Sequence, residues 1–397
     1  MLYERDVFQK IKKVLPREEF VVLTGPRQAG KTTLLIMLKA YLENQGQLCH
    51  YFNLENPQYL DLLNNHPFNI FDIIPNLKAR QNIFIDEIQY LDDPTNFMKL
   101  LYDEKRSRLK IIASGSSAFY IDEKFKDSLA GRKFLFEIFP LNFDEFLVFN
   151  RRHELLLKKG KRISAYYKDI LSGLWERYLV YGGYPKVVLA EDDDMRKILL
   201  EELGASYIKK EAKEAGIKNT GKYFSLLKIL AEQIGSLVNS QGLANTLKIA
   251  HKTIDEYFYV MKKSYQVAFI RPFYRSLRKE LTKMPKVYFY DTGLRNFFVD
   301  DFNLLGRRRD KGAFLENIAF RELSIQAGSP EKIKFWRTQD KNEVDFIAGG
   351  EAFEIKFDQG RLRRNNYREF TSRYPDIKLT FLTYKDILER FYGYRIV

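Results

Sequence analysis

Two glycines, a lysine and a threonine at fixed spacing form the part of the sequence best suited to chemistry. Gly25 to Thr32 reads GPRQAGKT and fits the pattern G-x-x-x-x-G-K-[ST]. The glycines of this pattern let backbone N–H groups surround phosphates, while the lysine reaches the β and γ phosphates and the hydroxyl binds Mg²⁺. We therefore expect a site for ATP and Mg²⁺ made by Gly25, Pro26, Arg27, Gln28, Ala29, Gly30, Lys31, Thr32 and Thr33.

Acids and serines follow two further apolar runs. Residues 82–87 read NIFIDE, which predicts a strand that ends in two carboxylates. We expect Asp86 to hold Mg²⁺ and Glu87 to polarise the attacking water. The run 109–113 ends in serines, so Ser114 and Ser116 are both candidates to sense the γ phosphate. Serines after a strand are more often turn residues, so this role depends on their order along the chain.

A strand, a loop and a helix must position the phosphate-binding residues. Residues 20–35 read FVVLTGPRQAGKTTLL, in which an apolar, β-branched run precedes the glycine-rich turn and an apolar helical pattern follows it. This order predicts an α/β fold with a parallel sheet over residues 1–150. The next region, 151–220, has helical periodicity, and we expect it to be a lid or a connector.

A second group of acids lies near the C-terminus. Residues 343–347 (EVDFI) and 351–357 (EAFEIKF) alternate polar and apolar residues, and Gly349 and Gly350 between them predict a hairpin turn. In that register Phe346 faces Phe353, Asp345 faces Glu354, and Glu343 faces Lys356. Since like charges opposite each other destabilise a sheet, a divalent cation held by Asp345 and Glu354 is expected.

The order Asp, then Glu-x-Lys on adjacent strands, resembles the PD-(D/E)XK nuclease superfamily. The resemblance implies that Asp345 and Glu354 bind Mg²⁺, that Lys356 positions water, and that Glu316 in a preceding helix completes the site. Val344 stands where that family often has proline. Two interpretations remain open, which are a competent nuclease and a nuclease-like platform in which Glu343 pairs with Lys356. Residues 292–397 are expected to form this restriction-endonuclease-like α/β domain.

Residues 221–291 combine three amphipathic segments with a β-type run and a basic stretch. Helices are expected from Lys222, over 240–247 and from Thr253, followed by a strand from Val267 to Ile270. This order favours a winged helix that binds DNA, although such folds also dock proteins. Lysine and arginine side chains there would meet phosphates, namely Lys252, Arg271, Arg275, Arg278, Lys279, Lys283 and Lys286.

The charge distribution agrees with a polyanionic partner in the C-terminal part. The chain has 66 Lys and Arg against 52 Asp and Glu, a net charge of +14, yet residues 1–150 hold only 19 basic and 20 acidic side chains. A charged surface or heat adaptation explains the same excess. One cysteine and four histidines exclude a disulfide and a structural zinc cluster. The apolar runs are too short to span a bilayer and no signal peptide is evident, so a cytoplasmic protein is expected.

Longer strings resemble prokaryotic AAA+ ATPases in which a P-loop domain precedes a helical region and a C-terminal domain. These strings are SLAGRKFLFEIFPLNFDEF from Ser128, YGGYPKVV from Tyr181 and VYFYDTGLRNFF from Val287. The resemblance implies that Arg132 is an arginine finger or a sensor, and a finger would make the protein a homo-oligomer. A surface arginine paired with an acid is the alternative.

These observations lead to one main hypothesis and two alternatives. The main hypothesis is an ATP-hydrolysing AAA+ protein that binds DNA and cleaves or remodels it through its C-terminal domain. The first alternative is a regulatory switch ATPase whose C-terminal domains bind a protein partner. The second is a DNA-binding ATPase whose nuclease-like domain is inactive.

Overall fold

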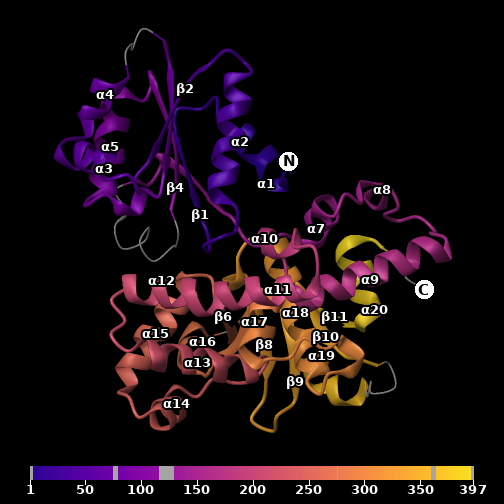
Figure 1. Cartoon of the computed structure of the whole chain (residues 1–397). Coiled ribbons are helices and arrows are strands. Elements are labelled where there is room, and N and C mark those ends of the chain that lie inside the picture. Colours follow the sequence, from indigo (N-terminus) through magenta and orange to yellow (C-terminus); the bar gives the residue numbers. More distant parts are fainter. Residues whose placement is uncertain (1–2, 75–78, 116–128, 275, 359–363, 395–397) are drawn as a thin grey trace. The chain divides into compact units, whose positions relative to one another are not determined.

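Internal contacts divide the chain into two units. The computed structural model describes residues 3–74, 79–115, 129–274, 276–358 and 364–394 (Figure 1). The first unit comprises Met1–Pro140 and Lys263–Tyr265, and the second comprises Leu141–Lys262 and Gln266–Val397. Over the described ranges, no helix has both the length and the apolar character needed to cross a membrane.

Five parallel strands form the sheet of the first unit, in the order β2-β3-β4-β1-β5. Parallel strands of one sheet need crossover connections; α5 connects the neighbours β3 and β4, and α2 connects β1 to β2 at the edge of the sheet. The strands expected from the apolar runs at 20–24 and 109–113 are confirmed, and the one expected at 82–87 runs from Gln81 to Asp86, so Glu87 lies just beyond it. The elements of this unit are α1 (Asp6–Lys12), β1 (Phe20–Thr24), α2 (Lys31–Glu43), β2 (Leu48–Asn53), α3 (Pro57–Asn65), α4 (Ile70–Ile73), β3 (Gln81–Asp86), α5 (Pro94–Lys105), β4 (Leu109–Ser114) and β5 (Lys133–Glu137).

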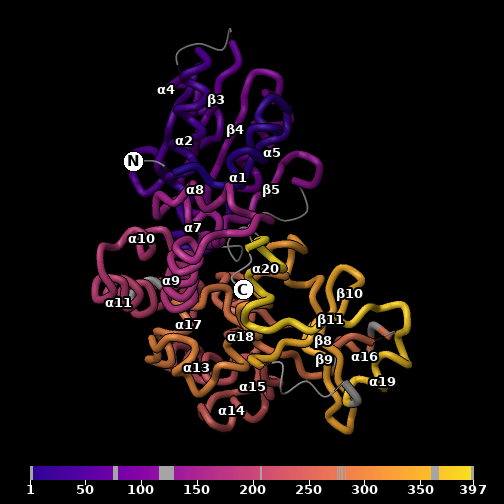
Figure 2. Tube along the Cα trace, turned by 90° about the vertical axis from the view of Figure 1, so that its right-hand side faces the viewer, coloured from indigo at the N-terminus to yellow at the C-terminus, as the bar shows by residue number. Residues whose placement is uncertain are grey.

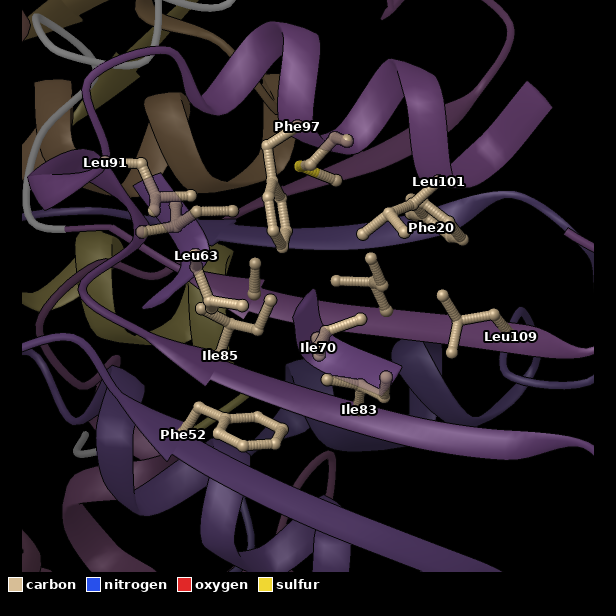
Figure 3. Packing of buried hydrophobic residues seen from close by; sticks show 14 of the residues in the cluster. Phe20, Phe52, Leu63, Ile70, Ile83, Ile85, Leu91, Phe97, Leu101 and Leu109 are labelled. Atoms are coloured by element: carbon tan, nitrogen blue, oxygen red, sulfur yellow. The ribbon is translucent and has the colours of Figure 1, made fainter. Parts of the chain in front are cut away.

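Successive residues of these strands pack on opposite faces of the sheet. Val21 and Leu23 join a cluster with the leucines of α2, whereas Phe20 and Val22 join a cluster with the apolar side chains of α5. Figure 3 shows the second cluster, with the ring of Phe97 pointing from α5 toward the strands. Each of these side chains is buried, which stabilises the fold by about 1.5–3 kcal/mol per residue. The two packed faces fix the ends of β1 and β3, where the phosphate loop and the acids begin.

The second unit begins with helices, as the periodicity of residues 151–216 predicts. A six-residue π-helical segment (Glu202–Tyr207) interrupts the helical run before α12. The helices are α7 (Phe143–Phe149), α8 (His153–Leu156), α9 (Ala165–Tyr181), α10 (Pro185–Val188), α11 (Asp193–Glu201) and α12 (Ile208–Glu214).

Three helices and an antiparallel strand pair follow. The helix expected from Lys222 begins at Thr220, the one over 240–247 is as predicted, and the one expected from Thr253 begins at His251. The strand expected at Val267 pairs antiparallel with the strand at 286–289. The elements are α13 (Thr220–Glu232), α14 (Ser240–Leu247), α15 (His251–Lys263), β6 (Val267–Pro272), α16 (Leu277–Thr282) and β7 (Lys286–Phe289).

One six-stranded sheet, in the order β11-β10-β9-β8-β6-β7, runs through the second unit. Strands β8 to β11 lie together in Figure 2, and β8 joins them to β6 through a parallel pairing. Apart from Lys263–Tyr265, the expected regions 151–220, 221–291 and 292–397 therefore fall in one unit, and this sheet crosses the boundary expected at 291. The remaining elements are α17 (Thr292–Val299), α18 (Lys311–Ala327), β8 (Lys334–Arg337), β9 (Glu343–Ala348), β10 (Glu351–Ile355), α19 (Arg368–Arg373), β11 (Lys378–Leu382) and α20 (Tyr384–Tyr392).

Candidate functional site

The phosphate loop between β1 and α2 has a backbone that its glycines make possible. Gly25 has φ 145°, and a Cβ atom there would lie 2.1 Å from the carbonyl oxygen of Ile138. Gly30, the residue before α2, has φ 95°, and Gln28 has φ 61°. Only glycine adopts the first two conformations without strain. The loop ends where α2 begins, and the N–H groups in the first turn of a helix attract anions.

The loop lysine is held against the backbone of the loop. Lys31 is buried, and its Nζ donates to the carbonyl oxygens of Gly25 at 2.9 Å and Pro26 at 2.8 Å. Thr32 and Thr33 are exposed in the first turn of α2. Because both acceptors are neutral carbonyls, an anionic phosphate is a stronger partner for the ammonium group. The side chain is thus positioned at the loop with acceptors that a phosphate can replace.

An arginine from the N-terminal segment fixes the same loop. Arg5 is 9% exposed, and it donates from Nη1 to the carbonyl oxygen of Ala29 at 3.0 Å and from Nη2 to that of Phe139 at 2.9 Å. It therefore ties the loop to the segment that follows β5. Arg5 was not expected at this site, because its spacing from the phosphate loop in the sequence does not indicate this contact.

Asp86 is held by two hydroxyl groups. It is 3% exposed, with Oδ1 accepting from Ser114 Oγ and Oδ2 accepting from Tyr51 Oη at 2.9 Å. Both donors are neutral hydroxyl groups, so they do not neutralise the charge of the carboxylate. A hard divalent cation prefers carboxylate and hydroxyl oxygens, and Asp86 together with Thr32 fits Mg²⁺ in this respect. Tyr51, on the neighbouring strand β2, was not expected from the sequence.

Glu87 has a backbone conformation that is unusual for its residue type. Its φ of 57° and ψ of 47° lie in the left-handed region, just beyond the end of β3. Its carboxylate accepts from Gln89 Nε2. Burial raises the pKa of Glu87, while the bond from Gln89 and the charge of Lys31 oppose this effect. The charge of Lys31 thus acts on Glu87, as expected of an acid that follows β3 in the same sheet as the loop.

Three further residues were expected near this site, namely Ser114, Ser116 and Arg132. Ser116 lies outside the described residues. Ser114 bonds to Asp86 and also accepts from the backbone N–H of Glu87 at 3.4 Å, so it contacts both acids. Arg132 pairs with Asp103 through two bonds, from Nε at 2.8 Å and from Nη2 at 3.2 Å. The alternative of an arginine paired with a surface acid therefore describes Arg132 in this structure.

The C-terminal hairpin has the expected turn and register. Gly349 and Gly350 have φ of 60° and 83°, and Phe346 pairs with Phe353. Beyond this pair the ladder gives way to side-chain bonds, because the N–H of Asp345 donates to Glu354 Oε2 at 3.3 Å and that of Ile355 donates to Asp345 Oδ2 at 2.8 Å. The two carboxylates thus lie together where the strands separate.

The partners expected for Glu343 and Lys356 are wrong. Lys356 pairs with Glu354, the residue two positions before it, while Glu343 pairs with Arg337 and with Lys286. The reason is the register of the next strand, in which Arg337 of β8 lies opposite Glu343. The position of Lys286 also differs from the expectation, in which it contacted phosphates at the surface. It is 1% exposed, at the start of β7.

Lys286 lies within a group of carboxylates. Its Nζ is 2.5 Å from Glu343 Oε1, 3.8 Å from Glu316 Oε2 and 3.9 Å from Asp345 Oδ1. Burial lowers the pKa of Lys286, but Tyr288 and the three acids outweigh it and raise the pKa well above its usual value. The lysine is therefore charged. Glu316 comes from α18, as expected, and reaches the same group.

Burial shifts the acids of this cluster toward their neutral forms. It is the largest cause of the raised pKa of Glu316 and of Asp345, and with the nearby Asp345 it raises the pKa of Glu354 to about 7. Tyr367 Oη donates to Glu354 Oε1 at 2.7 Å, a contact that the sequence did not indicate. Among the residues that the structure describes, no group of three or more acidic, histidine or cysteine side chains is arranged to hold a metal ion.

The fit of a divalent cation to Asp345 and Glu354 is consequently poor. Oδ2 of Asp345 and Oε2 of Glu354 accept backbone N–H groups, Oε1 of Glu354 accepts from Lys356 and Tyr367, and Oδ1 of Asp345 faces Lys286. Every oxygen of the pair already has a donor or a cation beside it. A magnesium ion at about 2.1 Å from these oxygens would lie beside the ammonium groups of Lys286 and Lys356, whereas both donors to Asp86 are neutral hydroxyl groups.

The basic residues expected to contact nucleic acid are exposed where their side chains are described. Lys252, Arg278 and Lys283 are exposed, and Arg271 is exposed while donating to the carbonyl oxygen of Leu281 at 2.9 Å. The side chain of Lys279 is not described, and Arg275 lies outside the described residues. The exposed members lie on α15, on β6, on α16 and in the segment before β7.

Three family models match successive parts of the chain. Residues 17–147 match the model of an AAA domain. Residues 172–305 and 311–389 match two models described as domains of unknown function, DUF8612 and DUF4143. The first match ends within α7 and the second begins within α9, whereas the first unit ends at Pro140, before α7.

The curated relatives extend over most of the chain. An uncharacterized protein of Methanocaldococcus jannaschii is 27% identical over 351 residues, which are 86% of this chain and 75% of that protein. An uncharacterized protein of Haemophilus influenzae is 26% identical over 360 residues, which are 88% of this chain and 84% of that protein.

Among solved structures, AMPPCP-bound DnaA from Aquifex aeolicus is 13% identical, with 64% of this chain and 86% of that chain covered and a TM-score of 0.31. The ORC2 protein of Aeropyrum pernix in its ADP form is 14% identical, with 66% and 85% covered and a TM-score of 0.34. Together with the loop, the acids and the strand order of the first unit, the family match shows that residues 17–147 are an AAA-type P-loop domain.

Proposed function

We propose that the first unit binds ATP with Mg²⁺ and hydrolyses it, and that the second unit is a binding platform that this hydrolysis regulates. The observations that carry the first part are a phosphate-type loop with Lys31 between β1 and α2, and Asp86 and Glu87 at the end of β3 in the same parallel sheet. A phosphate-binding loop, an acid suited to a cation and a buried acid suited to a base are the parts that phosphoryl transfer to water requires.

Each residue has a separate task in this reaction. The N–H groups of the loop and Lys31 bind the β and γ phosphates and stabilise their charge, while Arg5 keeps the loop in shape. When bound, Mg²⁺ neutralises phosphate charge beside Thr32 and Asp86. Glu87, whose raised pKa makes it more basic than an ordinary carboxylate, orients the attacking water and accepts its proton. Ser114 holds Asp86 and Glu87 in register.

The test compares ATP binding with ATP hydrolysis in three variants. Lys31→Ala is expected to lose both, because the phosphates lose their ammonium partner. Glu87→Gln is expected to keep binding and to lose hydrolysis by about 10²–10⁴-fold, the usual contribution of a general base. Lys39→Ala, which removes an exposed ion pair with Glu43 on the same helix, serves as the control. Hydrolysis by Glu87→Gln at the wild-type rate would refute the assignment.

DNA is the partner that we propose for the second unit. The support is the exposed basic set Lys252 on α15, Arg271 on β6, Arg278 on α16 and Lys283 before β7, in a region where three helices precede an antiparallel strand pair. That order of elements is typical of winged helices. A protein partner docked on the same elements is the competing candidate. The two differ in salt dependence, because neutralised phosphates release counterions on binding.

A titration of labelled duplex DNA at several salt concentrations separates these candidates. For DNA binding, the logarithm of affinity is expected to fall with the logarithm of salt concentration by about 0.9 per phosphate contact. Replacing Lys252 and Lys283 with alanine is expected to reduce this slope by about two. An affinity that does not change with salt would favour protein docking instead.

Arg132 has a proposed role that depends on a second copy of the chain. As an arginine finger it would leave Asp103 and reach the phosphates bound by a neighbouring subunit. Hydrolysis would then rise more steeply than protein concentration in the range where the subunits associate. Arg132→Ala would remove that dependence while leaving ATP binding unchanged. A rate strictly proportional to protein concentration would leave Arg132 as a partner of Asp103 alone.

DNA cleavage by the second unit is a competing function, supported by the meeting of Asp345, Glu354 and Lys356 at the separation of β9 and β10. The occupied carboxylate oxygens favour a platform without catalysis. Incubation with linear, forked and four-way DNA, with and without ATP and Mg²⁺, distinguishes the two. Cleavage that Lys356→Ala abolishes would establish a nuclease, and its loss in Lys31→Ala would show that ATP hydrolysis controls it.

A further inference from the structure

We propose that Lys286 is the resident cation of the acidic cluster in the second unit, so that its ammonium group takes the place of the divalent metal that the arrangement of Asp345 and Glu354 implies. The proposal rests on the contacts of Lys286 within the second unit and does not depend on ATP hydrolysis or on DNA binding. It assigns to this lysine a role that the family resemblance does not contain.

The first argument is the distribution of charge. Four carboxylates lie together, and three cations of the described residues contact them. Lys286 contacts Glu343, Glu316 and Asp345, while Arg337 adds a second contact to Glu343 and Lys356 neutralises Glu354. Buried carboxylates are tolerated only when they are paired or protonated. The protein itself thus supplies nearly all of the compensating charge that a metal would bring.

The second argument is the way in which Lys286 is held. The backbone of Lys286 pairs with Ile270 on β6 and forms a β-bridge with Leu237. Its side-chain Nζ lies 5.4 Å from the centre of the Phe335 ring. The side chain is 1% exposed, so it is buried inside the second unit. A lysine on a surface loop could swing away when a cation arrives. This one is fixed in the sheet.

The third argument concerns the space beside Glu316. A Cβ atom on Gly235 would lie 2.8 Å from Glu316 Oε2, and Tyr288 Oη donates to the same oxygen at 3.4 Å. Glu316, whose side chain is 19% exposed, is thus approached by the segment after α13 as well as by β7. A cation bound to Glu316 and Asp345 would lie within a few ångströms of the ammonium group, and like charges at that separation repel strongly in a buried site. The ammonium group of Lys286 and a divalent metal ion are therefore alternative cations for the same carboxylates.

Metal binding by the full chain tests this proposal. All proteins carry Asp86→Asn to remove cation binding at the phosphate loop, and nucleotide is absent. Bound Mn²⁺ is counted by electron paramagnetic resonance, and thermal unfolding is followed with and without Mn²⁺. The parent protein is expected to bind no Mn²⁺ through the cluster, so Asp345→Asn changes nothing in the count. Lys286→Met, which keeps the length of the side chain and removes its charge, is expected to bind one Mn²⁺ that the added Asp345→Asn abolishes.

Stability provides a second measurement. Lys286→Met leaves an uncompensated buried charge, so its thermal midpoint is expected to fall by roughly 10 °C and to recover when Mn²⁺ is added. Lys334→Met, which breaks the pair with Glu280 on the neighbouring part of the sheet, is the matched control and is expected to show no recovery. If Lys286→Met does not fold, the comparison of the parent with Asp345→Asn still decides. One Mn²⁺ bound by the parent and lost with Asp345→Asn would overturn the proposal.

Discussion

The left-handed backbone at Glu87 allows strain to be measured separately from chemistry. With φ 57° and ψ 47°, a residue with a Cβ atom carries about 1–2 kcal/mol that glycine does not. Glycine loses more conformational freedom on folding, which offsets about 0.5–1 kcal/mol of this gain. Glu87→Gly and Glu87→Ala both remove the carboxylate and its bond from Gln89, so their difference isolates the backbone. We expect the glycine variant to be more stable than the alanine variant by about 1 kcal/mol.

Calorimetry of the nucleotide-free proteins measures this difference, which corresponds to about 3 °C in the thermal midpoint for a unit of this size. ATP hydrolysis is expected to be lost equally in both variants, because neither retains the carboxylate. Glu87→Gln keeps the side-chain length and the backbone, so it separates the loss of charge from the release of strain. An alanine variant as stable as the glycine variant would show that the backbone at position 87 is not strained, and the reasoning would fail.

Three further predictions concern other parts of the molecule. Arg5→Ala leaves the carbonyl oxygens of Ala29 and Phe139 without their buried donor, so ATP affinity measured by calorimetric titration is expected to fall at least 10-fold, with only partial recovery in Arg5→Lys. Gly25→Ala is expected to abolish ATP binding while Gly46→Ala, where no atom lies within 4 Å, does not, as measured by the same titration. Burial raises the pKa of Glu322 to about 7 from its ordinary 4.5, so the folded state binds this proton more tightly than the unfolded chain and the free energy of unfolding falls as pH rises through that range. Glu322→Gln is expected to remove part of that fall in urea unfolding between pH 5 and pH 8.

The first unit could be predicted in detail because its function depends on residues close together in the sequence. The spacing of Gly25, Gly30 and Lys31 fixes a loop whose shape is local, and apolar runs fix β1 and β3 around it. Even there, Arg5 and Tyr51 could not be found from the sequence. Their contacts join residues 24 and 35 positions apart, and they arise only once the sheet brings those segments together.

In the second unit, the pairing of β9 with β10 follows the register of the hairpin turn only close to that turn. The two-glycine turn correctly predicted the pairing of Phe346 with Phe353, because a hairpin turn sets the first pairs of its strands. The pairing of Glu343 with Lys356 required the same ladder to continue. It stops at Asp345, where side chains replace backbone partners, and β8 then supplies Arg337 to Glu343. The sequence contains no signal for the point at which two strands separate.

Three lysines are buried among the described residues, Lys31, Lys110 and Lys286. The two that lie at the candidate sites, Lys31 and Lys286, differ in the partners that hold them, and this difference bears on what each unit can do. Lys31 donates to two neutral carbonyl oxygens, so a phosphate can take over the ammonium group with a gain in electrostatic energy. Lys286 lies among three carboxylates, and an anionic ligand would have to displace charged partners in a buried site. The first arrangement is suited to exchange with a ligand during a reaction cycle. The second arrangement holds its lysine permanently, which agrees with our proposal that the second unit is a platform and that its partner binds at the exposed basic residues instead.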